Sequence, residues 1–161
     1  MRSIVLFLVL TLMCGSAVYA GGTANTWKGV TNNWSTASNW STGIVPVQAT
    51  DNVIIPALGG SVVFNPVLSA ASACRQITSL AAGASISASG AFALTIGNAN
   101  AIAAVTGTAS ISCNVVMPAA ATVTNASALT MSGIISGAAT SLTKAGAGIL
   151  TLSGANTYAG Q

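Results

Sequence analysis

Two pentapeptides, Leu129-Thr130-Met131-Ser132-Gly133 and Leu150-Thr151-Leu152-Ser153-Gly154, repeat one pattern at a spacing of 21 residues. Apolar residues alternate with Thr or Ser, and a small turn residue follows, as is typical of a half-buried strand that ends in a turn. Ala93 to Gly97 shares the Leu-Thr-apolar order. Self-similar strand units of this kind are typical of a solenoid, because each unit buries its apolar face only by stacking on its neighbours.

Short alternating segments continue this pattern along the chain after Gly21, with turns rich in Gly, Asn, Ala and Ser between them. Helix signals are nearly absent, since no stretch keeps apolar residues at helical spacing beside charged ones. The sequence therefore predicts an all-β protein, with strands at 52–55, 61–64, 84–87, 92–96, 110–113, 122–124, 129–131 and 149–152.

Two all-β arrangements could use these strands, a sandwich built from hairpins or a coiled parallel solenoid. Tight Asn-Gly and Asp-Gly hairpin turns are missing, which weakens the sandwich. Small residues at the corners and a repeated inward apolar position favour coils stacked about 4.8 Å apart. We expect a right-handed parallel β-helix (β-solenoid) with an N-terminal tryptophan-containing cap.

The composition is 52% apolar and 3% charged, and the net charge of +3 is scattered along the chain. No basic patch is present, which argues against nucleic-acid binding. After the N-terminal segment no apolar run reaches membrane-spanning length, so no transmembrane segment is expected. Residues 1–20 resemble a secretory signal, with Arg2, an apolar stretch from Ile4 to Met13 and small residues before Gly21. Lipidation at Cys14 is the rival interpretation, but Leu12-Met13 lacks the expected small residue.

Removal of the signal leaves Cys74 and Cys113. Two cysteines in an exported protein suggest a disulfide. Their 39-residue separation corresponds to about two coils, or roughly 10 Å, which exceeds the ~7 Å Cα limit for a disulfide. The spacing therefore predicts free, buried thiols.

Residues 142–160 contain Lys-x-Gly-x-Gly-x-Leu-x-Leu-x-Gly-x-Asn-x-Tyr-x-Gly and closely resemble the autotransporter-associated β-strand repeat, or passenger-associated transport repeat. The resemblance implies coils of a surface-exposed β-helical passenger. Residues Trp27 to about Ile96 resemble, more loosely, the N-terminal region of Bacteroidetes-type secreted surface proteins. Neither a sorting domain nor a barrel follows Gln161, so we expect the front part of a longer product or a truncated one.

Catalysis requires groups that titrate or coordinate, and the mature chain has no His, no Glu, one Asp and two Cys. Paired-carboxylate glycosidases, Ser-His-Asp triads and metal sites each lack a required residue. We therefore expect no enzymatic activity, metal or cofactor. Asp51 is interpreted structurally, as an acceptor of backbone N–H groups that fixes the turn into the first coil.

Two functions remain for the mature chain. The first is a structural or adhesive module, secreted or held at the outer cell surface, whose partners are the secretion machinery and surface glycans or host and matrix proteins. The second is a carbohydrate-binding module with Trp27, Trp34, Trp40 and Tyr158 as stacking platforms. We expect residues 21–50 to form the cap and 51–161 the solenoid. Capping is favoured for the tryptophans, because an open solenoid end needs a cover.

Overall fold

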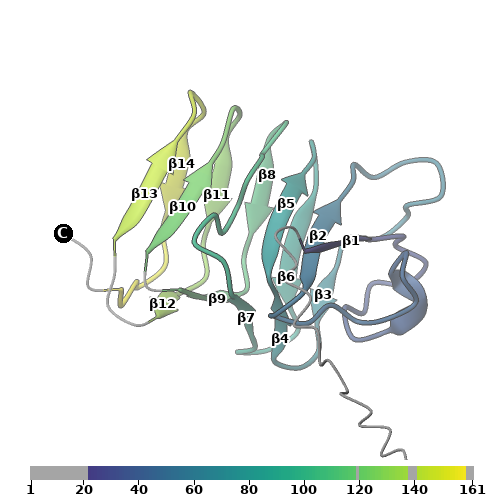
Figure 1. Ribbon diagram of the computed structural model, residues 1–161. Coiled ribbons are helices and arrows are strands. Elements are labelled where there is room, and N and C mark those ends of the chain that lie inside the picture. Colours follow the sequence, from purple (N-terminus) through teal and green to yellow (C-terminus); the bar gives the residue numbers. More distant parts are fainter. Residues whose placement is uncertain (1–21, 119, 138–140, 159–161) are drawn as a thin grey trace, which may run out of the picture.

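The computed structural model describes residues 22–118, 120–137 and 141–158. It is an all-β solenoid in which parallel strands stack in register (Figure 1). The predicted signal at 1–20 and the last residues of the predicted repeat lie outside the described residues. The elements are β1 (Thr23–Thr26), η1 (Ala37–Asn39), β2 (Asp51–Ile55), β3 (Val67–Leu68), β4 (Ser72–Cys74), β5 (Gln76–Leu80), β6 (Ser85–Ala88), β7 (Ala93–Ile96), β8 (Ala109–Ile111), β9 (Asn114–Met117), β10 (Ala121–Thr124), β11 (Leu129–Met131), β12 (Ile135–Gly137), β13 (Leu142–Ala145) and β14 (Leu150–Leu152).

Three stacks of parallel strands form the walls of the solenoid. One follows the order β14-β11-β8-β6-β3 and another the order β12-β9-β7-β4. The third contains β1-β2-β5 and β10-β13, which isolated bridges at Ile102 and Val105 connect. The predicted β-solenoid is therefore confirmed. Among the described residues the 3-10 turn η1 is the only helical segment, and none of them forms a helix of the length and hydropathy that crossing a bilayer requires.

The core consists of columns in which equivalent residues of successive coils stack on one another. One column contains Val53, Ile77, Ile102 and Val123, all fully buried. Each column follows from the period of two in a strand, because in-register pairing keeps the same side of every strand inward. In the last coil Lys144 pairs with Val123 and so occupies the next position of this column, where it is exposed.

The predicted register of Leu129 and Leu150 is confirmed, but the coils are not all of one length. Ile86 pairs with Ile111, a longer step, because the corner segments of the earlier coils are longer. The strand predicted at 61–64 is wrong. Gly59 and Gly60 have positive φ angles and Pro66 follows, so this segment forms a loop with one antiparallel bridge from Gly59 to Val62.

The N-terminal segment contributes both a strand and a cover. β1 pairs in parallel with β2 from Thr23↔Asp51 to Thr26↔Ile54, so the sheet begins before residue 51. The residues that follow β1 fold over the end of the solenoid, together with the loop after β2 (Figure 1). Residues 21–50 therefore supply the first strand of the solenoid in addition to the cap.

Candidate functional site

The three tryptophans form one enclosed cluster at the N-terminal end. Trp27, Trp34 and Trp40 are 1%, 0% and 0% exposed. The ring of Trp40 lies between the other two, with edge-to-face contacts at centroid distances of 5.0 Å to Trp27 and 4.7 Å to Trp34. Such contacts are the favoured geometry for aromatic pairs. The cluster therefore covers the last open layer of the core, as the cap prediction requires.

Hydrogen bonds fix the position of this cluster. Nε1 of Trp27 donates to the carbonyl of Phe64 at 2.6 Å, and Nε1 of Trp40 donates to the carbonyl of Trp34 at 2.8 Å. Asn39 is fully buried, donates to Asn33 and Thr31, and accepts the backbone N–H of Thr31. The buried amide satisfies the irregular backbone of the cap, where no strand ladder is available.

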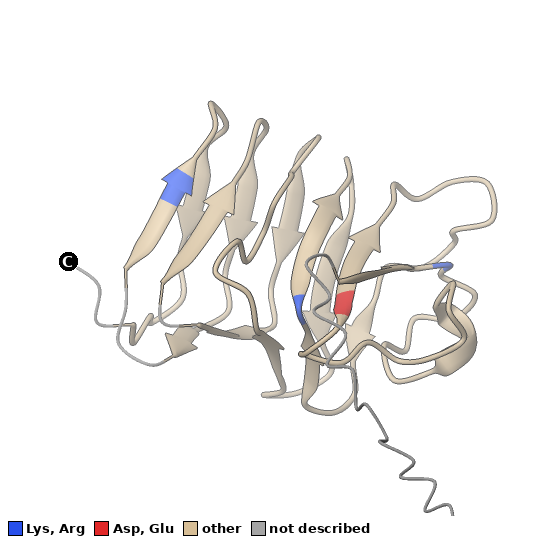
Figure 2. Ribbon diagram, in the orientation of Figure 1, with Lys and Arg blue, Asp and Glu red and all other residues tan. Residues whose placement is uncertain are grey.

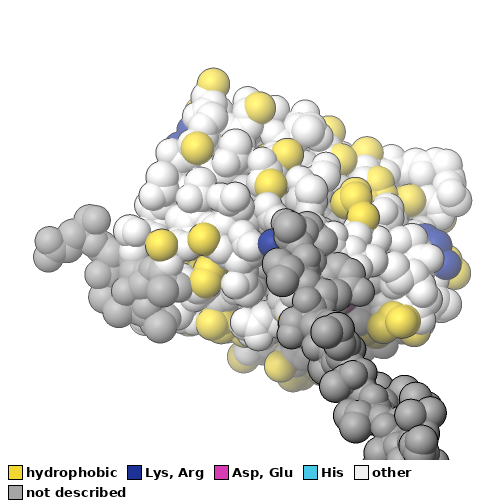
Figure 3. Space-filling model, in the orientation of Figure 1, with side chains coloured by type: hydrophobic (Ala, Val, Ile, Leu, Met, Phe, Trp, Pro, Cys, Tyr) yellow, Lys and Arg dark blue, Asp and Glu magenta, His cyan; other side chains and the backbone are white. Residues whose placement is uncertain are grey.

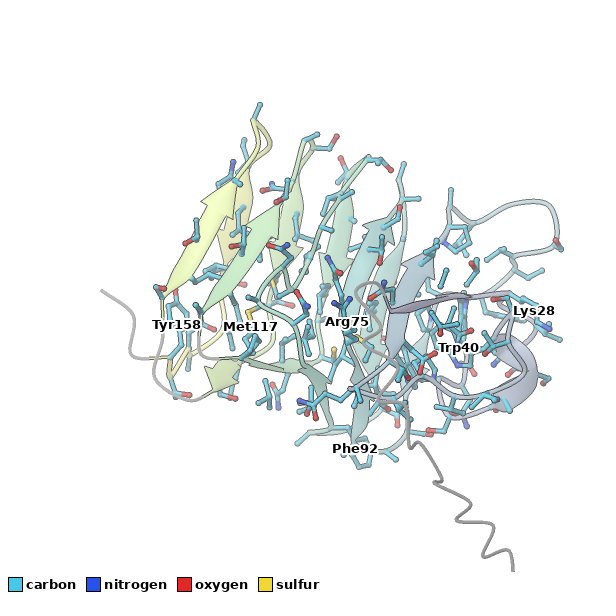
Figure 4. The ribbon with its side chains drawn as sticks, viewed as in Figure 1. Lys28, Trp40, Arg75, Phe92, Met117 and Tyr158 are labelled. Carbon is cyan, nitrogen blue, oxygen red and sulfur yellow. The ribbon has the colours of Figure 1, made fainter. Side chains whose placement is uncertain are left out.

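The structure does not bring the four predicted stacking residues together. Trp40 lies in the cap and Tyr158 at the opposite end of the solenoid (Figure 4). Tyr158 is half-buried and packs against the core. A sugar stacks on an accessible ring face, and none of the three indole rings presents one. These four residues therefore do not form a common binding surface.

Asp51 fixes the turn before β2, as the sequence predicts. Its Oδ2 accepts the backbone N–H of Val47 at 3.0 Å and the hydroxyl of Thr50 at 2.9 Å. Arg75 lies at the corner between β4 and β5, where its Nη1 donates to Oδ1 of Asn52 at 2.9 Å. Both residues thus have structural partners from the first coils. No group of three or more His, Cys, Asp or Glu occurs among the described residues, which also enclose no pocket.

The prediction of free, buried thiols is confirmed, because neither Cys74 nor Cys113 forms a disulfide. Cys74 ends β4 and Cys113 precedes β9, and β7 lies between these two strands. Burial raises the pKa of Cys74 to about 12, and the nearby Asp51 and Cys113 raise it further. Burial likewise raises the pKa of Cys113 to about 12. Both side chains therefore act as small apolar core residues.

These thiols predict how stability depends on pH. Above pH 9 the unfolded chain releases both protons, whereas the folded chain keeps them up to about pH 12. Stability is therefore unaffected by the thiols below pH 9 and falls between pH 9 and 12, by about 1.4 kcal/mol per pH unit for each thiol. Urea melts at pH 7 to 11 measure this slope. A Cys74→Ala, Cys113→Ala variant provides the control, and an equal slope in that variant would contradict the assignment.

The last described coil shows why the residues of the 142–160 pattern recur together. Leu150 and Leu152 of β14 face inward above Leu129 and Met131. A Cβ atom at Gly148 would overlap the carbonyl oxygen of Ser127 in the coil below. Asn156 accepts the backbone N–H of Ile135 through Oδ1 at 2.8 Å. Each of these positions therefore serves the stacking of one coil on the next.

A regular array of hydroxyl groups lies on the outer face of β6, β8, β11 and β14. Pairing aligns Ser85, Ser110, Thr130 and Thr151 in one row across these strands. Backbone bonds from Ser112 to Ile86, Ser132 to Ile111 and Ser153 to Met131 align a second row two residues further on. We name these eight residues the hydroxyl lattice: Ser85, Ser87, Ser110, Ser112, Thr130, Ser132, Thr151 and Ser153.

Sequence reasoning did not identify the hydroxyl lattice, although its signal is present. Four segments share the order Ser or Thr, apolar residue, Ser: they are 85–87, 110–112, 130–132 and 151–153. The strand prediction used the apolar member of each segment to find the core. Only the register of the coils shows that the flanking hydroxyls form two straight rows.

Comparison with known proteins gives one match. The family model described as the passenger-associated-transport-repeat matches residues 142–161, the segment that contains β13 and β14. No curated protein and no solved structure matches the chain. The predicted resemblance of residues 27–96 to Bacteroidetes-type surface proteins has no support from these comparisons. The coil of β13 and β14 is thus similar to the passenger-associated transport repeat, and this repeat and the solenoid fold fit the passenger region of an autotransporter surface protein.

Proposed function

We propose that this chain is a non-catalytic, structural and adhesive passenger module that is exported and held at the outer cell surface. The observation that supports this proposal best is the position of the matched repeat, which stacks in register on β10 and β11 as one further coil. The same stacking extends to β1. The repeat therefore belongs to one continuous solenoid.

The chemistry of the surface is consistent with a module that binds rather than reacts. The chain has no His or Glu, and Figure 2 shows its few charged residues scattered over the cap, the corner near β5 and β13. The face in Figure 3 is mainly uncharged, with scattered hydrophobic side chains. General acid–base chemistry needs paired titratable groups, and the described residues bring none together.

Adhesion also has a structural observation in its favour. Six exposed large apolar side chains occur between residues 30 and 64, in the cap and the loop after β2. Exposed apolar groups are typical of surfaces that contact other molecules. The six are Val30, Ile44, Val47, Leu58, Val63 and Phe64.

Surface display tests this proposal. We expect the chain, fused ahead of an outer-membrane translocator barrel, to be detected by antibody against an N-terminal tag on intact cells, and to increase adhesion to immobilised glycans or matrix proteins. The translocator alone is the control. Display without any gain in adhesion would contradict the adhesive role, and retention in the periplasm would contradict the passenger role.

The same cells test the carbohydrate alternative. If a glycan array shows binding, Trp34→Phe keeps an aromatic ring in the cap and leaves outer surfaces unchanged. Because the ring of Trp34 is enclosed, we expect glycan binding to be equal in this variant. Selective loss of binding, with unchanged thermal stability, would favour the tryptophans as the sugar site.

A further inference from the structure

We propose that the hydroxyl lattice on β6, β8, β11 and β14 is an ice-binding surface. This inference goes beyond the proposed function and does not depend on it, because it concerns one face of the purified chain. It rests on the rigidity of the lattice, its unpaired hydroxyls, its spacing and its lack of charge.

The lattice is held from below by the core. Between its two rows lie the inward residues Ile86, Ile111 and Met131, which are 0%, 0% and 1% exposed, and the half-buried Leu152. In-register strands on both sides of β8 and β11 fix the backbone (Figure 1). The hydroxyls therefore project from a fixed sheet rather than from loops.

The hydroxyls of the lattice are available to an external partner. Five of the eight residues are exposed and three are half-buried. Across the described parts of the chain, no side-chain hydroxyl of the lattice has a hydrogen-bond partner. By contrast, Ser89 at the next turn donates to the carbonyl of Leu68. Each lattice hydroxyl can thus both donate and accept outward.

The spacing of the lattice is close to that of oxygens in ice. Hydroxyls of one row repeat with the strands at about 4.8 Å, and the two rows lie about 6.7 Å apart along the strands. In ice each oxygen bonds tetrahedrally at about 2.7–2.8 Å, so second-neighbour oxygens lie about 4.5 Å apart. The mismatch along a row is about 0.3 Å per strand, or about 0.9 Å over four strands, which rotation of the hydroxyls can absorb.

The chemistry of this face disfavours other partners. None of Lys28, Asp51, Arg75 and Lys144 lies on the four strands (Figure 2), so neither an anionic polymer nor a mineral cation lattice has a charged group to bind. The four strands contain no aromatic residue on which a sugar ring could stack. A small soluble ligand gains little from hydroxyls alone, since each bond replaces one to water. A solid whose oxygens repeat at the same spacing gains from all eight hydroxyls at once.

Ice-affinity partitioning tests the proposal with the exported, purified chain. Slowly grown ice should incorporate the wild-type protein, and recrystallisation of fine-grained ice should be inhibited. Thr130→Tyr places a ring at the middle of the lattice, and we expect its incorporation to fall to that of an ordinary protein that ice excludes. Thr130→Ser keeps the hydroxyl and should retain incorporation.

Thr143→Tyr is the matched control, because Thr143 is exposed on β13 and pairs with Thr122 in a different sheet. It should enter ice like the wild type. Exclusion of the wild type from ice, or equal incorporation of Thr130→Tyr, would overturn the proposal. Binding to crystalline cellulose or chitin that Thr130→Tyr abolishes, together with exclusion from ice, would overturn it in favour of a polysaccharide surface. Thermal melts of all variants confirm that each is folded.

Discussion

Replacement of Trp40 by alanine is expected to lower the free energy of unfolding by about 3–5 kcal/mol, the usual cost of removing a buried large aromatic side chain. Trp40 is 0% exposed and contacts the rings of both Trp27 and Trp34. Its Nε1 is also the donor to the carbonyl of Trp34. The substitution therefore removes ring packing on two sides and leaves a buried carbonyl without that donor.

The effect should begin at the N-terminal end of the solenoid. In a repeat fold each unit is stabilised mainly by its neighbours, so loss of the cap exposes the first coil before the last. All three tryptophans lie in the cap, and their fluorescence therefore reports this end alone. Trp40→Ala should lower the melting temperature by roughly 10 °C, with the fluorescence change preceding the loss of the far-UV circular dichroism signal.

Two matched variants separate packing from other effects. Val30 belongs to the same cap but is 59% exposed, so Val30→Ala should change stability by about 0.5 kcal/mol or less. Trp40→Phe keeps a ring but removes the donor to Trp34, and its stability should lie between those of the wild type and Trp40→Ala. An unchanged melting temperature in Trp40→Ala would show that these rings are not a structural cap.

The sequence predicts the interior of this solenoid better than its corners. The columns that contain Leu129 and Leu150 follow from a period of two and an interval of 21 residues, both of which are local patterns. Short strands such as β3, β4 and β12 were not predicted, because two or three residues cannot show an alternation. Their conformation depends on the coil beneath them, and single-segment reasoning does not include that coil.

The outer surface shows the same division. Burial of the tryptophans was predicted because an open end needs a cover, and the reason is physical rather than local. The hydroxyl lattice was missed because alignment of Ser110 with Thr130, 20 residues away, depends on the length of each corner. Corner lengths vary between coils, so a sequence search at one fixed interval does not align the two rows. A register for every coil is needed first.

Gly133→Ala is the second substitution with a large expected effect, because at this corner two coils meet backbone to backbone. A Cβ atom at Gly133 would overlap the carbonyl oxygen of Cys113 in the coil below. Backbone atoms cannot yield as a flexible side chain can, so the strands on either side, β11 and β12, would have to move away from β8 and β9. Overpacking of this kind costs about 1–3 kcal/mol or more.

The corresponding clash recurs one coil further on, where Gly154 lies over Gly133 itself. Gly133→Ala should therefore weaken the stacking of β14 as well as β11, and proteolysis should cleave first after residue 133. Gly90→Ala is the control: its Cβ would lie 3.4 Å from the ring of Phe92, an ordinary contact, and its stability should stay within about 0.5 kcal/mol of the wild type. Equal urea midpoints for the two variants would contradict the in-register stacking at Gly133. A selective loss in Gly133→Ala would show that close backbone approach between coils fixes this glycine, and by the same geometry the glycine of the repeat at 154.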